Sequence, residues 1–278
     1  MSGQQGEHFP WGLAAWTAAV VAFLILPLLV IVVFSFNSRD LTALPLEELT
    51  LKWYMKLFVS TDLINALVNS FIVAAIVSVL ATVIGTLAAI GLVRSSARAT
   101  SIMRPILSMP MMTPRLVVGI ALLSLYNIAR IDLSLATVVF GHTVIAIPYV
   151  VLVVSARLVG LDPHIEEAAY DLGTRRIRVI IDILLPVLRP SIIGAALIAF
   201  TLSFDEVVIA FFTTGNDSTL PVAIWAMLRF GITPEINAIS TITMTLTVLT
   251  ALVAEVIIRR TRGSGPNLDP RRPPKFSQ

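Results

Sequence analysis

The chain has 278 residues, of which 56% are hydrophobic and 13% are charged, and its mean hydropathy is +0.89. This apolar fraction excludes an ordinary soluble domain and predicts an integral membrane protein. The absence of cysteine excludes disulfide frameworks, thiolate metal sites and cysteine nucleophiles. The net charge of +3 does not indicate nucleic-acid binding, because the charged residues lie between long apolar runs, where they determine topology.

The first part of the chain contains two predicted transmembrane helices separated by a polar segment. The apolar run over residues 11–36 is too long for the core of a signal peptide, so we interpret it as a retained first span. Residues 37–63 are polar and aromatic, which is typical of an interfacial helix on the membrane surface. The second span covers about residues 64–93, and its small residues favour close helix packing: Ala81, Gly85 and Ala89.

A third span is predicted over about residues 105–128, and it contains two prolines, Pro110 and Pro114. The prolines predict that the span is broken around MPMMTPR, residues 109–115, and that its first part is unwound. Irregular backbone at membrane depth is tolerated where it is buried in protein or faces a cavity, so this part could form the wall of a pathway. The alternative is a plain break at the membrane interface.

Three further spans complete an all-α membrane domain over residues 1–262. They cover about residues 135–159, 191–214 and 236–258, and a proline-rich tail over 263–278 is expected to be disordered. Six spans place both termini on one side of the membrane. The loops on that side carry most of the Lys and Arg residues, so the positive-inside rule predicts that both termini are cytoplasmic.

The longest polar segment on the same side runs from Asp162 to Pro186. Its apolar residues recur at helical spacing on either side of Gly173, which predicts two short amphipathic helices joined by a turn. Asp162 is a suitable N-cap for the first helix, Pro163 suits its first position, and Gly173 can adopt the left-handed conformation that ends it. Pro186 is expected to stop the second helix. Such a hairpin could dock on another protein or lie on the lipid surface.

The spacing of residues in this segment resembles the EAA signature of permease subunits in binding-protein-dependent ABC importers. Glu167, Ala168 and Ala169 are followed at the family's spacing by Gly173, Ile183, Leu185 and Pro186. The resemblance implies a type I importer permease fold, with six transmembrane helices and a coupling helix that docks on a cytoplasmic ATPase subunit. The residues that it assigns to coupling are Glu166, Glu167, Ala168, Ala169, Gly173, Ile183, Leu185 and Pro186.

Asp205 and Glu206 are adjacent carboxylates inside the predicted fifth span. An ionised carboxylate at the bilayer centre costs roughly 2.5 to 3.5 kcal/mol on insertion scales, so both must face water, a cavity or a partner. We interpret at least one of them as a contact for the transported solute, to which Ser203 could add a hydroxyl. The alternative is a structural network within the transporter complex.

The chain also resembles the second permease subunit of spermidine/putrescine importers over nearly its whole length. The resemblance implies that Asp205 and Glu206 help to pass a cationic polyamine. Arg115 departs from the pattern of these importers, because relatives often carry an acidic residue just after the proline in the third span. Arg115 therefore either pairs with a carboxylate or indicates a zwitterionic or anionic amino compound as the solute. The similar stretches are FNS at 36–38, KWYMKLF at 52–58, SFDEVVIAFFTTG at 203–215, TLPVAIWAML at 219–228 and GITPEINAIST at 231–241.

No residue pattern in the chain indicates catalysis. It contains no P-loop motif for binding a nucleotide, and its three histidines lack the spacing of metal ligands. We therefore expect no catalytic residue, metal or cofactor in this chain, and ATP, if it is the energy source, must be bound by another polypeptide. The resemblance implies that two separate ATPase subunits bind ATP and Mg²⁺.

The resemblance further implies a second, homologous permease in a heterodimer, a periplasmic substrate-binding protein and a bacterial inner-membrane location. An ion-coupled secondary transporter that uses Asp205 or Glu206 is the main alternative. An intramembrane aspartyl protease is a third class, but it needs aspartates from two spans, and only one span here carries deep acids.

Overall fold

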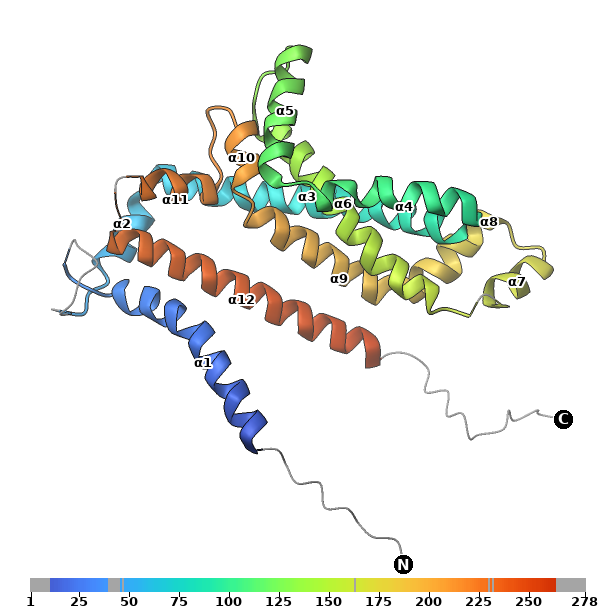
Figure 1. Cartoon of the computed structure of the whole chain (residues 1–278), viewed down its shortest axis with the longest axis horizontal. Helices are drawn as coiled ribbons and strands as arrows, with labels where there is room; N and C mark the ends of the chain where they lie inside the picture. Colours follow the sequence, from blue (N-terminus) through green and yellow to red (C-terminus); the bar gives the residue numbers. More distant parts are fainter. Residues whose placement is uncertain are drawn as a thin grey trace, which may run out of the picture. The chain divides into compact units, whose positions relative to one another are not determined.

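The computed structural model describes residues 11–39, 46, 48–162, 164–229, 231 and 233–263, and within these ranges the chain is almost entirely helical (Figure 1). The predicted tail beyond Gly263 lies outside them. The elements are α1 (Trp11–Phe34), α2 (Lys52–Val59), α3 (Thr61–Arg94), α4 (Ala97–Met112), α5 (Arg115–Ala129), α6 (Leu135–Val159), α7 (His164–Asp171), α8 (Arg176–Arg178), the π-helix η1 (Val179–Leu184), α9 (Leu185–Phe204), α10 (Val208–Thr213), α11 (Leu220–Leu228) and α12 (Pro234–Gly263).

The chain is divided into two compact units. The smaller unit comprises the described residues up to Thr61 together with Ala226–Thr245, and the larger unit comprises Asp62–Trp225 and the described residues from Leu246 onwards. The prediction of a single domain over residues 1–262 stays a prediction.

Helix α2 anchors the smaller unit through its aromatic residues. The indole N–H of Trp53 donates to the carbonyl of Asn37 at 2.8 Å, and the hydroxyls of Tyr54 and Ser35 are 2.7 Å apart. Trp53 is buried, so part of this helix packs on its own unit. The interfacial helix predicted over residues 37–63 is therefore wrong in extent, because the helix covers only Lys52–Val59. The described residues before it include turns and an isolated bridge between Asn37 and Leu49, and residues 40–45 and 47 lie outside the described residues.

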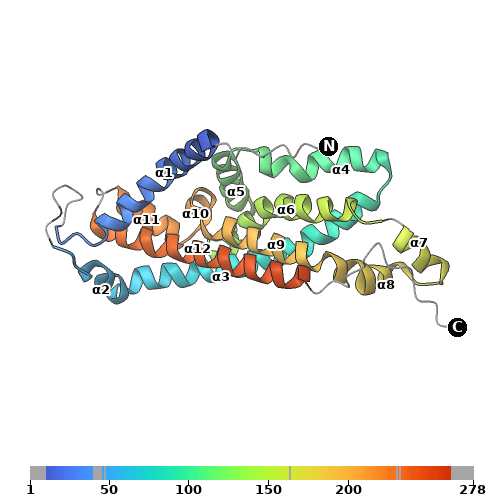
Figure 2. The same ribbon diagram turned by 90° about the horizontal axis from the view of Figure 1, so that it is seen from below.

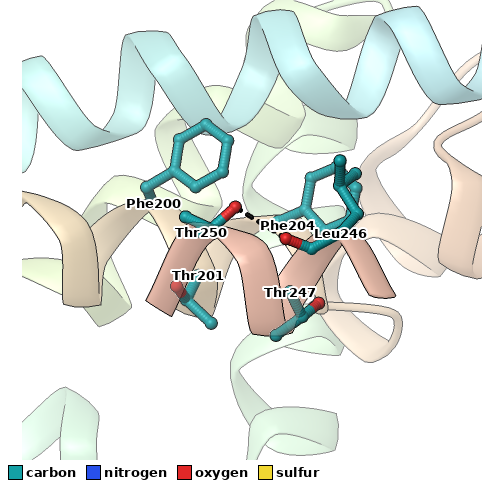
Figure 3. A pocket seen from close by; sticks show the side chains of 6 residues that line it. All are labelled: Phe200, Thr201, Phe204, Leu246, Thr247 and Thr250. Atoms are coloured by element: carbon teal, nitrogen blue, oxygen red, sulfur yellow. Dashed lines mark hydrogen bonds between the residues drawn. The ribbon is translucent and has the colours of Figure 1, made fainter. Parts of the chain in front are cut away.

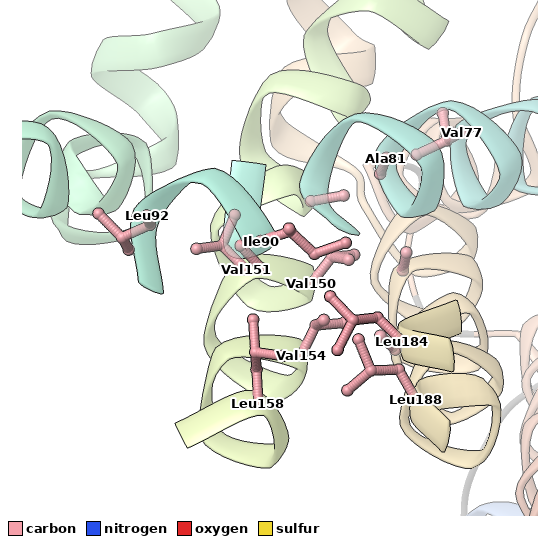
Figure 4. Close-up of a cluster of buried hydrophobic side chains, with 14 of the residues drawn as sticks. Val77, Ala81, Ile90, Leu92, Val150, Val151, Val154, Leu158, Leu184 and Leu188 are labelled. Atoms are coloured by element: carbon pink, nitrogen blue, oxygen red, sulfur yellow. The ribbon is translucent and has the colours of Figure 1, made fainter. Parts of the chain in front are cut away.

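The core of the larger unit lies where α3, α6 and α9 meet, and Figure 4 shows side chains from these helices pointing into it. The small-residue stripe predicted in the second span belongs to this core, since Ala81, Gly85 and Ala89 are all buried. A Cβ atom added to Gly85 would lie 2.7 Å from the Cβ of Val150 on α6. The absence of a side chain at Gly85 thus sets how closely α3 approaches α6.

The number of spans is confirmed only in part. Among the described residues, four helices are long and apolar enough to cross a membrane, namely α1, α3, α6 and the continuous helix Arg176–Phe204. The α4–α5 pair counts as a fifth span only if its two helices, bent by 98°, cross together. The sixth predicted span falls in α12, which has 30 residues. A six-span count stays a prediction.

The third predicted span is broken at Pro114, as expected, but not at Pro110, and its first part is not unwound. Residues that were predicted to be unwound form α4, which begins at Ala97 and contains Pro105 and Pro110 within its length. The chain breaks at Thr113 and Pro114, and α5 starts at Arg115. Pro110 is accommodated in the helix, whereas Pro114 forces the residue before it into an extended conformation, with ψ of 133° at Thr113.

A small cavity between α9 and the second half of α12 does not provide a binding site (Figure 3). Its volume is about 10 Å³, at the lower limit for one water molecule. Phe200, Phe204 and Leu246 supply apolar walls. The hydroxyls of Thr201 and Thr250 donate to carbonyls of their own helices, so the cavity offers little polar recognition.

Candidate functional site

The first candidate site is the hairpin around α7, and its caps match the sequence prediction. The Asp162 carboxylate accepts the backbone N–H of His164 at 3.0 Å, which confirms Asp162 as a capping residue. Gly173 has φ of +77°, the left-handed conformation predicted for it. The N–H groups of Gly173 and Thr174 donate to the carbonyls of Tyr170 and Ala169, which is the Schellman arrangement at a helix end. Pro163 lies outside the described residues.

The second predicted helix of the hairpin does not end at Pro186, and that expectation is wrong. The chain from Arg176 to Phe204 is one continuous helix, in which η1 occupies Val179–Leu184 and Pro186 is at the start of α9. Proline normally breaks a helix because it lacks an N–H and its ring meets the carbonyl four residues earlier. The wider π turn just before Pro186 changes this hydrogen-bond pattern, and the helix continues through it.

Glu166 and Glu167 have different environments although they are adjacent on α7. Glu166 is buried and forms an ion pair with Arg94 at the end of α3. Glu167 is exposed, and its carboxylate lies 2.8 Å from Nδ1 of His164. This hydrogen bond is the main reason that the pKa of His164 is raised, and the charge of Asp162 adds to it. Glu166 therefore holds α7 to the helix bundle, while Glu167 faces outward.

The outward side of the hairpin is apolar. Ile165 and Leu172 are 47% and 86% exposed, and Ile177 is 59% exposed on the other side of the turn. Of the two alanines, Ala168 is exposed and Ala169 is buried. Ile183 and Leu185 are half-buried, whereas Gly173 and Pro186 are exposed. We call the exposed apolar residues Ile165, Ala168, Leu172 and Ile177 the hairpin surface.

The second candidate site is a break between α9 and α10, where the predicted fifth span is interrupted. Helix α9 ends at Phe204 and α10 starts at Val208, so Asp205 and Glu206 are at a helix break and not inside one continuous helix as expected. One carboxylate oxygen of Glu206 accepts the N–H groups of Val208 and Ile209 at 3.0 and 3.1 Å. Glu206 thereby satisfies backbone donors that the break leaves without helical partners.

Glu206 also forms an ion pair with Arg115, the first residue of α5. The Glu206 side chain is 1% exposed, whereas the Arg115 side chain is 41% exposed. Helices α5 and α10 lie side by side in Figure 1, so the ion pair connects the break before α5 to the break before α10. Of the two predicted explanations for Arg115, the structure shows the first: Arg115 pairs with a carboxylate.

Asp205 has a different environment from its neighbour. It is exposed, and among the residues that the structure describes its carboxylate has no hydrogen-bond or ion-pair partner. Because the two acids lie at a helix end, one turns into the protein and the other turns out of it. Asp205 is therefore the exposed carboxylate of the pair.

Ser203 contacts His142 on α6, a partner that the sequence prediction missed. Its hydroxyl lies 2.9 Å from Nδ1 of His142, and both side chains are buried. No local pattern in the sequence indicates this pair, because the two residues are 61 positions apart. The site prediction for Ser203 as a direct solute contact is untested, but its hydroxyl already has a protein partner.

Comparison with known proteins assigns the family. Residues 81–263 match the family model described as binding-protein-dependent transport system inner membrane component. The chain belongs to this family. Members are permease subunits, membrane components without catalytic activity of their own, so this chain is a multi-pass permease subunit and not an enzyme.

Curated relatives of this permease include two transport proteins from Escherichia coli (strain K12). The spermidine/putrescine transport system permease protein PotC is 34% identical over 248 residues, covering 88% of this chain and 94% of PotC. The putrescine transport system permease protein PotI is 34% identical over 246 residues, covering 86% of this chain and 87% of PotI. The predicted resemblance to polyamine permeases is confirmed.

Solved structures confirm the predicted fold class. A bacterial ABC transporter involved in the import of alginate has a TM-score of 0.72 at 13% identity, with coverage of 90% of this permease and 96% of that chain. The MetNI methionine ABC transporter has a TM-score of 0.62 at 17% identity, with coverage of 72% and 96%. At these identities the likeness shows the fold alone, which is that of an all-α ABC importer permease.

Proposed function

We propose that this permease forms half of the passage of an ATP-driven importer for polyamines, with Asp205 as the carboxylate that contacts the cationic solute. The observation that carries the proposal is the exposed carboxylate of Asp205 at a helix break, which has no partner among the residues that the structure describes. The names of the relatives PotC and PotI support a polyamine as the solute.

The electrostatics of the break favour a cation. The carboxyl-terminal end of α9 carries the negative end of the helix dipole, and Asp205 adds a full negative charge at that point. Broken helices whose ends face the solute are a recurring feature of transporter binding sites. Glu206 contributes little net charge because Arg115 neutralises it. That ion pair also removes the reason to expect a zwitterionic or anionic solute, since Arg115 is already engaged.

The hairpin surface is the proposed docking site for a partner ATPase subunit. A helix that is capped at both ends and fixed by the Glu166–Arg94 ion pair can transmit a displacement to the bundle. Two such subunits would bind ATP and Mg²⁺, a second permease would complete the passage, and a periplasmic protein would deliver the solute. Both termini and the hairpin are then cytoplasmic. Nucleotide can shift the conformational equilibrium only through different affinities for the two states.

Uptake by reconstituted vesicles tests the proposal. The full transporter with its binding protein is compared for putrescine, spermidine and amino acids. Asp205→Asn is expected to lower polyamine uptake at limiting solute by about tenfold or more, since a contact to a charged group contributes roughly 1.5 to 3 kcal/mol. The matched control is Asp132→Asn, which removes an exposed carboxylate in the segment between α5 and α6.

Unchanged uptake of every solute by the Asp205→Asn transporter would contradict the proposed contact. The driving force is tested separately by dissipating the proton gradient while ATP is present inside the vesicles. Uptake should then persist, whereas an ion-coupled secondary transporter would lose it.

A further inference from the structure

A groove between α4 and α6 forms a second cavity, remote in the chain from the helix break at Asp205. Its volume is about 370 Å³, within the range of small-ligand sites. Residues of α4 at positions 104, 107, 108 and 111 form one wall, residues of α6 between 148 and 159 form the other, and Leu92 of α3 also lines the groove. Both sets recur every three or four positions, so each helix presents one continuous face to the groove.

The groove has one polar end and one apolar end. The two helices run antiparallel in Figure 2, and both lie within the larger unit. Arg104 is consequently at the end near the hairpin, where α4 begins and α6 finishes, and Met111 and Pro148 are at the other end. The face of α6 from Pro148 to Val159 is about 16 Å long at 1.5 Å per residue, which is close to one leaflet of a roughly 30 Å hydrocarbon core.

The charge of the groove suits an anion. Arg104 is the one charged residue among those that line it, and within the described part of the chain its guanidinium has no carboxylate partner. Ser108 and Ser155 add hydroxyls, and the buried Ser155 oxygen has no hydrogen-bond partner there. A polyamine would be repelled by Arg104, so the groove does not extend the proposed solute site.

We propose that this groove binds an anionic phospholipid of the surrounding membrane, with the phosphate at Arg104 and an acyl chain along the apolar part. Basic pockets between transmembrane helices recognise anionic headgroups in this way. The walls beyond Ser108 are formed mainly by aliphatic side chains and Met111, which match an acyl chain but offer nothing to a free phosphate ion. The lipid bridges α4 and α6 and stabilises their packing.

The experiment measures which lipids remain bound to the assembled transporter after purification in mild detergent. Native mass spectrometry is combined with thermal unfolding in vesicles of phosphatidylethanolamine, with and without phosphatidylglycerol. Wild type should retain phosphatidylglycerol and gain thermal stability from it. Arg104→Gln should bind it about fivefold more weakly, the effect of losing one arginine near the headgroup. Arg104→Lys should retain most of the binding, which separates loss of charge from misfolding.

Arg98→Gln is the matched control, because Arg98 is also an exposed arginine of α4 but does not line the groove. Equal loss of lipid from the Arg98→Gln and Arg104→Gln proteins would overturn the proposal, since it would indicate general surface attraction. Equal retention of phosphatidylethanolamine and phosphatidylglycerol by wild type would also overturn it. Displacement of the lipid by millimolar inorganic phosphate would assign the site to a free anion instead.

Discussion

Asp205 and Glu206 show how local geometry gives adjacent carboxylates different environments. Glu206 accepts two backbone N–H groups and faces Arg115, so its charge is fully satisfied inside the protein. Asp205 is turned to the outside of the same break. A continuous helix would have separated the two side chains by about 100°, whereas the break places them in different environments.

The Arg115–Glu206 ion pair should give a measurable interaction free energy between the two side chains. Arg115→Gln is expected to destabilise the permease by roughly 1.5 to 3 kcal/mol, because the buried Glu206 loses its charged partner. Glu206→Gln should cost a comparable amount. The double variant should cost clearly less than the sum of the two, as measured by thermal unfolding of the purified transporter in a double-mutant cycle. Strictly additive losses would show that the two side chains do not interact.

His164 predicts a pH dependence that is confined to α7. Its pKa is raised above the ordinary value of 6.5, mainly by the hydrogen bond with Glu167. The stabilisation from this pair is therefore complete below about pH 6.5 and is lost as the pH rises through the raised pKa. Hydrogen exchange of the α7 amides, corrected for intrinsic rates, should show protection that falls across this interval.

His164→Gln should remove this pH dependence while leaving the Asp162 cap in place. If the wild-type protein and this variant lose α7 protection equally as the pH rises, the His164–Glu167 pair is not the cause.

At the scale of whole helices, proline positions alone do not determine where an element ends. Pro110 and Pro148 lie inside α4 and α6, and Pro186 follows a π turn within a continuous helix, whereas Pro114 precedes a new helix. A helix tolerates proline where the lost hydrogen bond is shifted or compensated by its surroundings. These compensations depend on packing, which explains why the predicted stop at Pro186 and the predicted break at Pro110 were wrong.

The end of α7 can be tested with two glycines that differ only in backbone conformation. A Cβ on Gly173 or on Gly91 in α3 would meet no atom within 4 Å, but only Gly173 has a positive φ. Gly173→Ala should destabilise the hairpin by roughly 1 to 2 kcal/mol, the cost of a left-handed conformation with a side chain. Gly91→Ala should stabilise α3 by roughly 0.5 to 1 kcal/mol. Local hydrogen exchange measures both, and equal effects would contradict the Schellman assignment.

At the scale of the whole molecule in its transporter, a substitution on the hairpin surface tests whether this surface couples the permease to a partner ATPase subunit. Leu172→Asp should leave the fold intact because Leu172 is 86% exposed, but it should reduce ATP-driven uptake by about tenfold or more, as expected for a central interface residue. Ile131→Asp is the matched control, because Ile131 is 49% exposed in the segment between α5 and α6. Uptake and thermal unfolding are measured together; unimpaired uptake by the Leu172→Asp transporter would exclude docking at this surface.

The sequence predicted local features well and contacts between distant residues poorly. The span over residues 135–159 coincides with α6, and both the Asp162 cap and the left-handed Gly173 were predicted, because periodicity and capping act over a few neighbouring residues. The partner of Arg115 is 91 positions away, and that of Ser203 is 61 positions away. No local pattern specifies such pairs, so the different environments of Asp205 and Glu206 could not be predicted without the folded structure.

The ion pair between Arg94 and Glu166 has a mechanical consequence. It ties the last residue of α3 to α7, while α7 also follows α6 along the chain. The close approach of Gly85 to Val150 also packs α3 against α6 within the second half of each helix. A displacement of α7 is therefore transmitted to both α3 and α6. We expect these two helices to tilt together as one rigid body.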